Sequence, residues 1–146
     1  MQIINESNIE KAKNQIRKSE HPIAVQAQDY TFNRKLLEYG RFDTLILPSK
    51  TKNQRTLRKI EIGIDYIATK AATKNKVTLS LNLNQIKSLE KKQKAIELEK
   101  LIQTLKILRK SKTKFTILNQ NSKQTALSFL LSAGASSQQA KQAINS

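Results

Sequence analysis

The chain has 146 residues, with 27 Lys and Arg against 11 Asp and Glu, a formal net charge of +16 and a pI near 10.2. This length is typical of one domain with a single core, and the absence of cysteine excludes disulfides and thiolate metal sites. The sequence contains no run of eighteen apolar residues that would span a membrane.

The first half of the sequence alternates amphipathic stretches with short apolar runs. Residues 2–5 form a short β run, and the capping-box pattern of residues 7–10 predicts a helix that continues to about residue 19. Residues 22–28 and 44–48 predict two mostly buried strands, as parallel strands tend to be. The order β-α-β-α-β, with connections of a few residues, favours a parallel sheet with right-handed crossovers.

Helix ends in the first half are marked by polar residues and glycine. Asp29 or Thr31 is expected to cap the helix between the two buried strands, and Gly40 is expected to end it. In the next helix Asp65 is expected to cap the first turn, and Asn75 to end it in the left-handed region. The apolar stripe of that helix is Ile64, Ile67, Ala68, Ala71 and Ala72.

From residue 77 the apolar period changes from 3.6 to 2, which predicts a strand over residues 77–83. The rest of the chain continues the alternation, with a short helical piece in 84–90, a helix over 91–110, a fifth strand over 112–118, a helix over 123–133 and a second capping box at 136–139. Five strands are too few to close an eight-stranded β/α barrel. The sequence therefore predicts a single α/β domain over residues 1–146, built as an open or partial barrel or as a flat three-layer sheet.

Few residues in this sequence are suited to catalysis. His21 is the only histidine, which excludes His-based metal clusters, and its place before Pro22 at the entry to a strand indicates a structural role. A two-metal site built from Asp29, Asp43 and Asp65 at strand ends remains an alternative. With three glycines and no phosphate-loop motif, the chain is expected to hold no catalytic and no metal-binding residue of its own.

Basic residues gather in clusters, and residues 100–146 carry eight of them with no acidic residue. Each cluster alone is also what a solvated surface presents, but such a field attracts polyanions, nucleic acid above all. Because aromatic residues are few, we expect recognition of the shape and phosphates of a folded RNA rather than base stacking. The predicted RNA-binding residues are Lys50, Lys52, Arg55, Arg58, Lys59, Lys91, Lys92, Lys94, Arg109, Lys110, Lys112, Lys114 and Lys123.

Three segments together resemble a known family. They are residues 33–48 (NRKLLEYGRFDTLILP), residues 63–83 (GIDYIATKAATKN followed by an aliphatic strand) and residues 130–144 (LLSAGASSQQAKQAI). Their order and spacing resemble archaeal ribonuclease P protein component 3, the family of the eukaryotic thirty-kilodalton subunit. The resemblance implies a TIM-like barrel, from which this sequence is expected to lack the first β-α units. A truncated barrel is expected to expose a sheet edge and apolar surface near the N-terminus.

The resemblance also implies a function. Members belong to a cytoplasmic ribonucleoprotein, the endoribonuclease ribonuclease P, which removes the 5′ leader from precursor tRNA. The RNA subunit holds the active site with bound magnesium, so no cofactor is expected on this chain. Implied partners are ribonuclease P RNA, the component 2 protein, often as a heterotetramer, and precursor tRNA indirectly, with no membrane.

The sequence departs from the family at two places. Residues 118–121 (LNQN) replace a Ser-rich strand end, and the basic loop of residues 49–63 is expanded. Two other readings stay open: a general RNA-binding or ribosome-associated module, and a stand-alone metal-dependent phosphoesterase, against which the single histidine argues.

Overall fold

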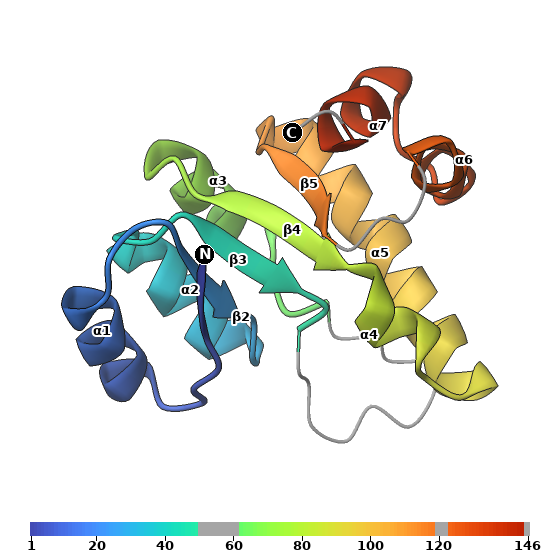
Figure 1. The fold of residues 1–146 in the computed structure, drawn as a ribbon. Coiled ribbons are helices and arrows are strands. Elements are labelled where there is room, and N and C mark those ends of the chain that lie inside the picture. Colours follow the sequence, from blue (N-terminus) through green and yellow to red (C-terminus); the bar gives the residue numbers. More distant parts are fainter. Residues whose placement is uncertain (50–61, 119–122, 145–146) are drawn as a thin grey trace.

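The computed structural model describes residues 1–49, 62–118 and 123–144. In these residues five strands form one sheet, ordered as they occur in the sequence and parallel throughout (Figure 1). The strands are β1 (Gln2–Ile4), β2 (Ile23–Gln26), β3 (Thr44–Leu47), β4 (Thr78–Asn82) and β5 (Phe115–Leu118). The predicted α/β alternation with a parallel sheet is confirmed, and the sheet is open, since β1 and β5 do not pair.

The helices are α1 (Ile9–Lys18), α2 (Tyr30–Tyr39), α3 (Tyr66–Lys74), α4 (Leu83–Lys87), α5 (Lys91–Ser111), α6 (Lys123–Ser132) and α7 (Ser137–Ile144). Helix α1 packs on α2, α2 packs on α3, and α3 packs on α5, while α7 packs on β5. Because every crossover moves to the next strand in the same direction, right-handed connections keep these helices on one side of the sheet. The winding is therefore that of a partial barrel and not of a three-layer sheet.

The two faces of the sheet differ in polarity. The register aligns Ile4, Val25, Leu45, Leu79 and Phe115 in one row, and all five belong to the core between the sheet and the helices. One residue further along, the aligned row on the opposite face is Gln26, Ile46, Ser80 and Thr116. The alternation seen in the sequence thus separates an apolar face from a more polar one.

Several helix ends differ from the sequence-based expectation. The first helix is capped by Asn8, whose side chain accepts a hydrogen bond from the amide of Lys11 (3.1 Å), instead of by the box that begins at Ser7. Asn75 has φ −91°, and the left-handed residue is Lys76, with φ 58°. Ile67 was expected on the buried stripe of α3 but is 56% exposed, since that helix buries Ala68, Thr69 and Ala72.

Other helix ends agree with the sequence. Asp29 caps α2 through the amide of Phe32 (2.8 Å), and Gly40 ends it at φ 67°. The side chains of Ser136 and Gln139 each accept the other residue's main-chain amide at 3.1 Å, which is the predicted capping box of α7.

The N-terminal edge of the sheet exposes apolar side chains. In the described residues β1 pairs with β2 on one side only, and Met1 and Ile3 are 61% and 59% exposed. An exposed sheet edge with apolar surface near the N-terminus is as expected from the sequence. None of the described helices is both long and apolar enough to cross a bilayer.

Candidate nucleic-acid interface

The predicted basic clusters at residues 91–94 and 109–114 lie at opposite ends of the sheet. Helix α5 runs antiparallel to the strands, so its start lies at their carboxyl end and its close at their amino end. Its 21 residues span about 30 Å. Lys91, Lys92 and Lys94 therefore lie far from Lys110 and Lys112, although all five belong to one stretch of sequence.

At the carboxyl end, Lys91 and Lys92 are exposed in the first turn of α5, and Lys94 is half-buried. Lys123 is exposed at the start of α6, after β5. The first turn of α5 contains no acidic residue, and Glu90 makes no side-chain capping bond there. Lysines at the positive end of a helix are locally unfavourable by about 0.3–1 kcal/mol each, so helix stability does not explain them. The predicted residues Lys50, Lys52, Arg55, Arg58 and Lys59 lie outside the described residues.

Amides and hydroxyls occupy the carboxyl end of the polar sheet face. Gln26 donates its side-chain amide to the carbonyl of Pro48 (2.9 Å) and accepts a hydrogen bond from Gln85 of α4 (3.0 Å). The hydroxyls of Ser80 and Thr116 pair across β4 and β5. Such groups donate and accept hydrogen bonds but do not exchange protons near pH 7, so this network positions main chain and does no acid–base chemistry.

The carboxylates proposed for a two-metal site do not converge. Asp29 and Asp65 cap α2 and α3 at the carboxyl end of the sheet, whereas Asp43 precedes β3 at the amino end. There Asp43 accepts hydrogen bonds from the Ile23 amide (2.7 Å) and contacts His21 Nδ1 (2.8 Å). Among the described residues no group of three or more His, Cys, Asp or Glu side chains lies together. The two-metal alternative is therefore wrong for these three residues.

The pKa values of the Asp43 and Asp65 carboxylates both lie below their ordinary range. For Asp43, burial alone raises the pKa, but the hydrogen bonds from His21 and the Ile23 amide outweigh it and lower the pKa. For Asp65, burial likewise opposes the hydrogen bonds from the Tyr30 hydroxyl and the Ala68 amide, and the net pKa is lowered. Both groups are therefore ionised anchors of the scaffold at neutral pH.

One lysine is part of the interior. The Lys100 ammonium lies 3.1 Å from Glu97 Oε1, and the two side chains are 5% and 12% exposed. The second carboxylate oxygen of Glu97 is buried without a hydrogen-bond partner. This ion pair lines a small pocket with Leu47, Ile62 and Leu81 below the carboxyl end of the sheet. Lys100 therefore contributes to packing and not to the charge of the surface.

At the amino end, five exposed lysines precede two neighbouring strands. We call them the amino-edge lysines: Lys74, Lys76, Lys110, Lys112 and Lys114. Their sequence context, TKNK before β4 and RKSKTK before β5, repeats a lysine-rich helix end ahead of a strand. Lys74 and Lys76 are missing from the sequence-based set, although this repeat was a signal that could have found them.

Lys76 and Lys112 both have a left-handed backbone, with φ 58° and 57°. Each closes a helix in a Schellman-type turn, in which the next amide returns to a carbonyl five residues earlier: Val77 to Ala72 (2.8 Å) and Thr113 to Leu108 (3.2 Å). Glycine is preferred in this position, where a residue with a Cβ costs about 1 kcal/mol more. At the corresponding ends of α2 and α6 the chain has Gly40 and Gly134.

Arg109, also predicted to bind RNA, is engaged within the protein. Its guanidinium donates to the carbonyl of Gly134 and, through Nε, to the side chain of Gln139 (3.4 Å). These bonds tie the end of α5 to the turn between α6 and α7. Arg109 therefore holds one wall of the amino-end surface in place.

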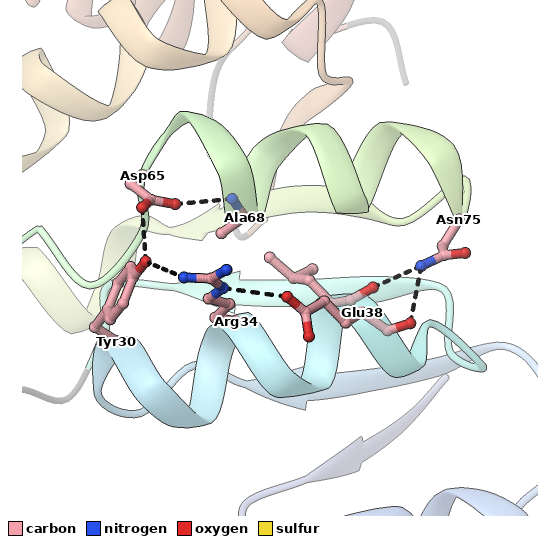
Figure 2. Close-up of polar contacts among 7 residues, drawn as sticks. Tyr30, Arg34, Glu38, Asp65, Ala68 and Asn75 are labelled. Carbon is pink, nitrogen blue, oxygen red and sulfur yellow. Dashed lines mark hydrogen bonds and ion pairs between the residues drawn. The ribbon is translucent and has the colours of Figure 1, made fainter.

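Helices α2 and α3 are joined by a row of polar contacts, which fixes the helix that leads into β4. The Tyr30 hydroxyl donates to Asp65 (2.6 Å), and Arg34 donates to Tyr30 (3.2 Å) and to Glu38 (3.1 Å) (Figure 2). At the other end of the pair Asn75 donates to α2. Asp65 also caps α3 through the amide of Ala68 (2.8 Å). The position of Lys76 therefore depends on contacts at both ends of α3.

Fold and charge together define an open α/β protein wound like part of a β/α barrel, with positive side chains at both ends of its sheet. No family model matches the sequence. The chain is 28% identical over 82 residues to Ribonuclease P protein component 3 of Methanococcus vannielii, a match that covers 56% of this chain and 32% of that protein.

The fold is similar to that of a chain in the cryo-EM structure of archaeal Ribonuclease P with mature tRNA. The TM-score is 0.76 at 18% identity, and the match covers 98% of this chain and 63% of the other. The sequence match thus spans about a third of the curated relative, and the structural match less than two thirds of the solved chain. The resemblance to ribonuclease P protein component 3 noted in the sequence is confirmed.

Proposed function

We propose that this chain is a protein subunit of archaeal ribonuclease P, which binds and stabilises the catalytic RNA during removal of the 5′ leader from precursor tRNA. The observation that carries the proposal is the agreement of two independent similarities, one in sequence to component 3 and one in fold to a chain of the assembly. A net charge of +16 supports it, since a protein that packs against folded RNA must offset the repulsion between phosphates.

In this proposal the RNA, with magnesium bound to it, cleaves the phosphodiester bond. The chain's own residues act by charge and by shape. Exposed lysines at the carboxyl end, such as Lys91 and Lys92, neutralise phosphates and release counterions, while the parallel sheet holds them on a rigid support. The amides of the polar sheet face keep the strand ends in register.

The proposed partners are ribonuclease P RNA, the component 2 protein as a heterotetramer, and precursor tRNA through the RNA, in a cytoplasmic particle. The exposed apolar side chains at the β1 edge favour a protein contact there. Mixing this chain with component 2 and measuring the mass of the complex by light scattering tests that partner. Elution of the two proteins as separate species at micromolar concentration would count against it.

Reconstitution tests the proposed function directly. Cognate ribonuclease P RNA is assembled with the other protein subunits, with and without this chain, and leader removal from precursor tRNA is measured at physiological magnesium. We expect the chain to raise the cleavage rate and its affinity for the RNA to fall steeply with salt. Equal affinity for an unrelated folded RNA, with no gain in cleavage, would instead support a general RNA-binding module.

A further inference from the structure

The α3–β4 and α5–β5 turns lie side by side at the amino end of the sheet (Figure 1). The register pairs Leu79 with Phe115, and the Leu79 amide donates to the carbonyl of Lys114 (3.0 Å). Lys76 and Lys112 each stand three residues before this pair. Because neighbouring strands are about 4.8 Å apart, the two left-handed lysines start from adjacent points on the same edge.

A network of hydroxyls locks the two turns together. Thr73 and Thr113 share a hydrogen bond of 2.9 Å, and the Thr113 hydroxyl also donates to the carbonyl of Thr69 (3.1 Å). Ser111 pairs with Thr113 at 2.7 Å. The turns that carry the lysines are therefore fixed relative to one another, so the spacing of their backbones does not depend on the flexible side chains.

A cleft of about 410 Å³ opens beside Lys112, between the end of α5 and the start of α7. Arg109, Lys112, Gln138 and Gln139 are among its lining residues. This volume falls within the usual range of ligand sites and exceeds that of a phosphate group. The first turn of α7 also brings the positive end of its dipole to the cleft. Its walls thus combine positive charge with amides that can donate hydrogen bonds.

The two turns and the cleft lie in stretches of sequence whose charge is of one sign. No acidic residue occurs in residues 66–89 or 100–146, which include both turns and the cleft. On the neighbouring helix, Glu38 is paired with Arg34 (3.1 Å). Asp43, at the amino end before β3, contacts His21 (2.8 Å). Within the described part of the chain no ion pair involves any of the amino-edge lysines.

The helix dipole explains only part of this arrangement. A basic residue in the last turn of a helix is favourable, which accounts for Lys74 and Lys110. It does not account for lysine in place of glycine at two left-handed positions. A strained residue that persists indicates a function that requires it.

We infer that the amino-edge lysines, with the cleft beside Lys112, form a phosphate-binding site for the RNA backbone. This site lies at the amino end of the sheet, opposite the carboxyl end, where such folds usually place their sites. The inference rests on the proposed function as far as the RNA is ribonuclease P RNA. The chain then contacts RNA at both ends of its sheet, about 30 Å apart along α5. Two separated anchors fix the orientation of the protein on the RNA.

The test is the double variant Lys76→Gly/Lys112→Gly, assayed for affinity to ribonuclease P RNA between 50 and 200 mM salt. The slope of log affinity against log salt is negative, and removing two phosphate contacts is expected to reduce its magnitude by about 2. Over that fourfold range of salt, the variant then loses about 16-fold less affinity than the parent. At the same time its Tm is expected to rise by about 3 °C per site, because glycine relieves the left-handed strain.

Two control variants separate charge from backbone. Lys76→Gln/Lys112→Gln removes the charge but keeps a side chain in the left-handed turn, so it lowers the slope without raising Tm. Lys11→Gln/Lys35→Gln removes the same charge from exposed positions on α1 and α2, and the slope is expected to change by much less. Equal slopes for the parent and both amino-edge variants would overturn the inference, and so would an equal loss in the α1–α2 variant.

The outcome is distinguishable from failure of the proposed function. If the chain supports leader cleavage and the amino-edge variants bind the RNA with an unchanged slope, the function stands and this site is wrong. If the chain gives no gain in cleavage but its binding to an unrelated folded RNA still depends on Lys76 and Lys112, the site stands as a phosphate-binding surface and the ribonuclease P assignment is wrong.

Discussion

Asn75, at the end of α3, donates its side-chain amide to the main-chain carbonyl of Leu37 in α2, 2.7 Å away, and so caps a helix to which it does not belong (Figure 2). A second, longer bond reaches the carbonyl of Glu38 (3.3 Å). The contact is possible because α2 ends at Gly40, where a Cβ would lie 2.5 Å from Asn75. The C-terminal end of α2 is therefore capped by a side chain from the C-terminal end of α3.

Gly40→Ala is expected to destabilise the fold more than Gly134→Ala. Both glycines are left-handed, with φ 67° and 98°, so alanine is strained by about 1 kcal/mol at each position. Only at Gly40 does the new methyl group also meet Asn75, whereas nothing lies within 4 Å at Gly134. Urea unfolding should show an additional loss of about 1–3 kcal/mol for Gly40→Ala. Equal losses at the two sites would mean that Asn75 moves aside at little cost.

Asp65→Asn should make the protein less stable at pH 7, and the loss should shrink as the pH falls through the folded pKa of Asp65. The folded pKa of Asp65 lies below its unfolded value of about 3.9. Its charge therefore stabilises the fold above the unfolded pKa, and the gain is lost as pH falls through the folded pKa. Because Asn is also a good N-cap, the variant can keep the bond to the Ala68 amide while it loses the charge and the acceptor for the Tyr30 hydroxyl.

Urea unfolding of both proteins at several pH values measures this effect, expected to be under about 1 kcal/mol because the carboxylate is partly exposed. Tyr30→Phe serves as the control, since it removes the hydrogen bond to Asp65 and should shrink the difference. A difference in stability that does not shrink at acid pH would contradict the linkage.

Lys100→Met should destabilise the protein by about 3–5 kcal/mol, because it leaves the carboxylate of Glu97 buried without its cation. The double variant Glu97→Leu/Lys100→Met removes both charges and is expected to be close to the parent in its free energy of unfolding. Chemical denaturation of the two single variants and the double variant completes the cycle. Additive losses would show that the two side chains are not coupled.

Lys91→Gln/Lys92→Gln should weaken RNA binding and slightly stabilise the fold. The two lysines stand at the positive end of α5, in a first turn without an acidic residue. Removing them is expected to raise the free energy of unfolding by a few tenths of a kcal/mol each, and to lower the salt slope of RNA binding by about 1 per lysine. A loss of stability together with unchanged binding would assign them a structural role instead.

Local pattern in the sequence determined the order and type of the elements. The change of apolar period near residue 77, the caps at Asp29 and Asp65 and the box at Ser136 depend on residues a few positions apart, and the structure confirms them. Patterns of this kind are local, so neighbours in the chain suffice to specify them. Asn75 shows where local pattern fails to predict structure. Its side chain bonds to α2, a different helix, and residue propensity takes no account of such a contact.

Only the tertiary structure decided which charges share a surface. Lys91 and Arg109 belong to one helix of 21 residues, which holds them near opposite ends of the sheet. Parallel pairing of β4 with β5 does the reverse, and brings Lys76 beside Lys112 across 36 positions. Burial likewise withdrew Lys100 from the surface. Phosphate binding depends on the distances between charged side chains in space. The crossover connections set these distances, and the number of charges along the chain does not reveal them.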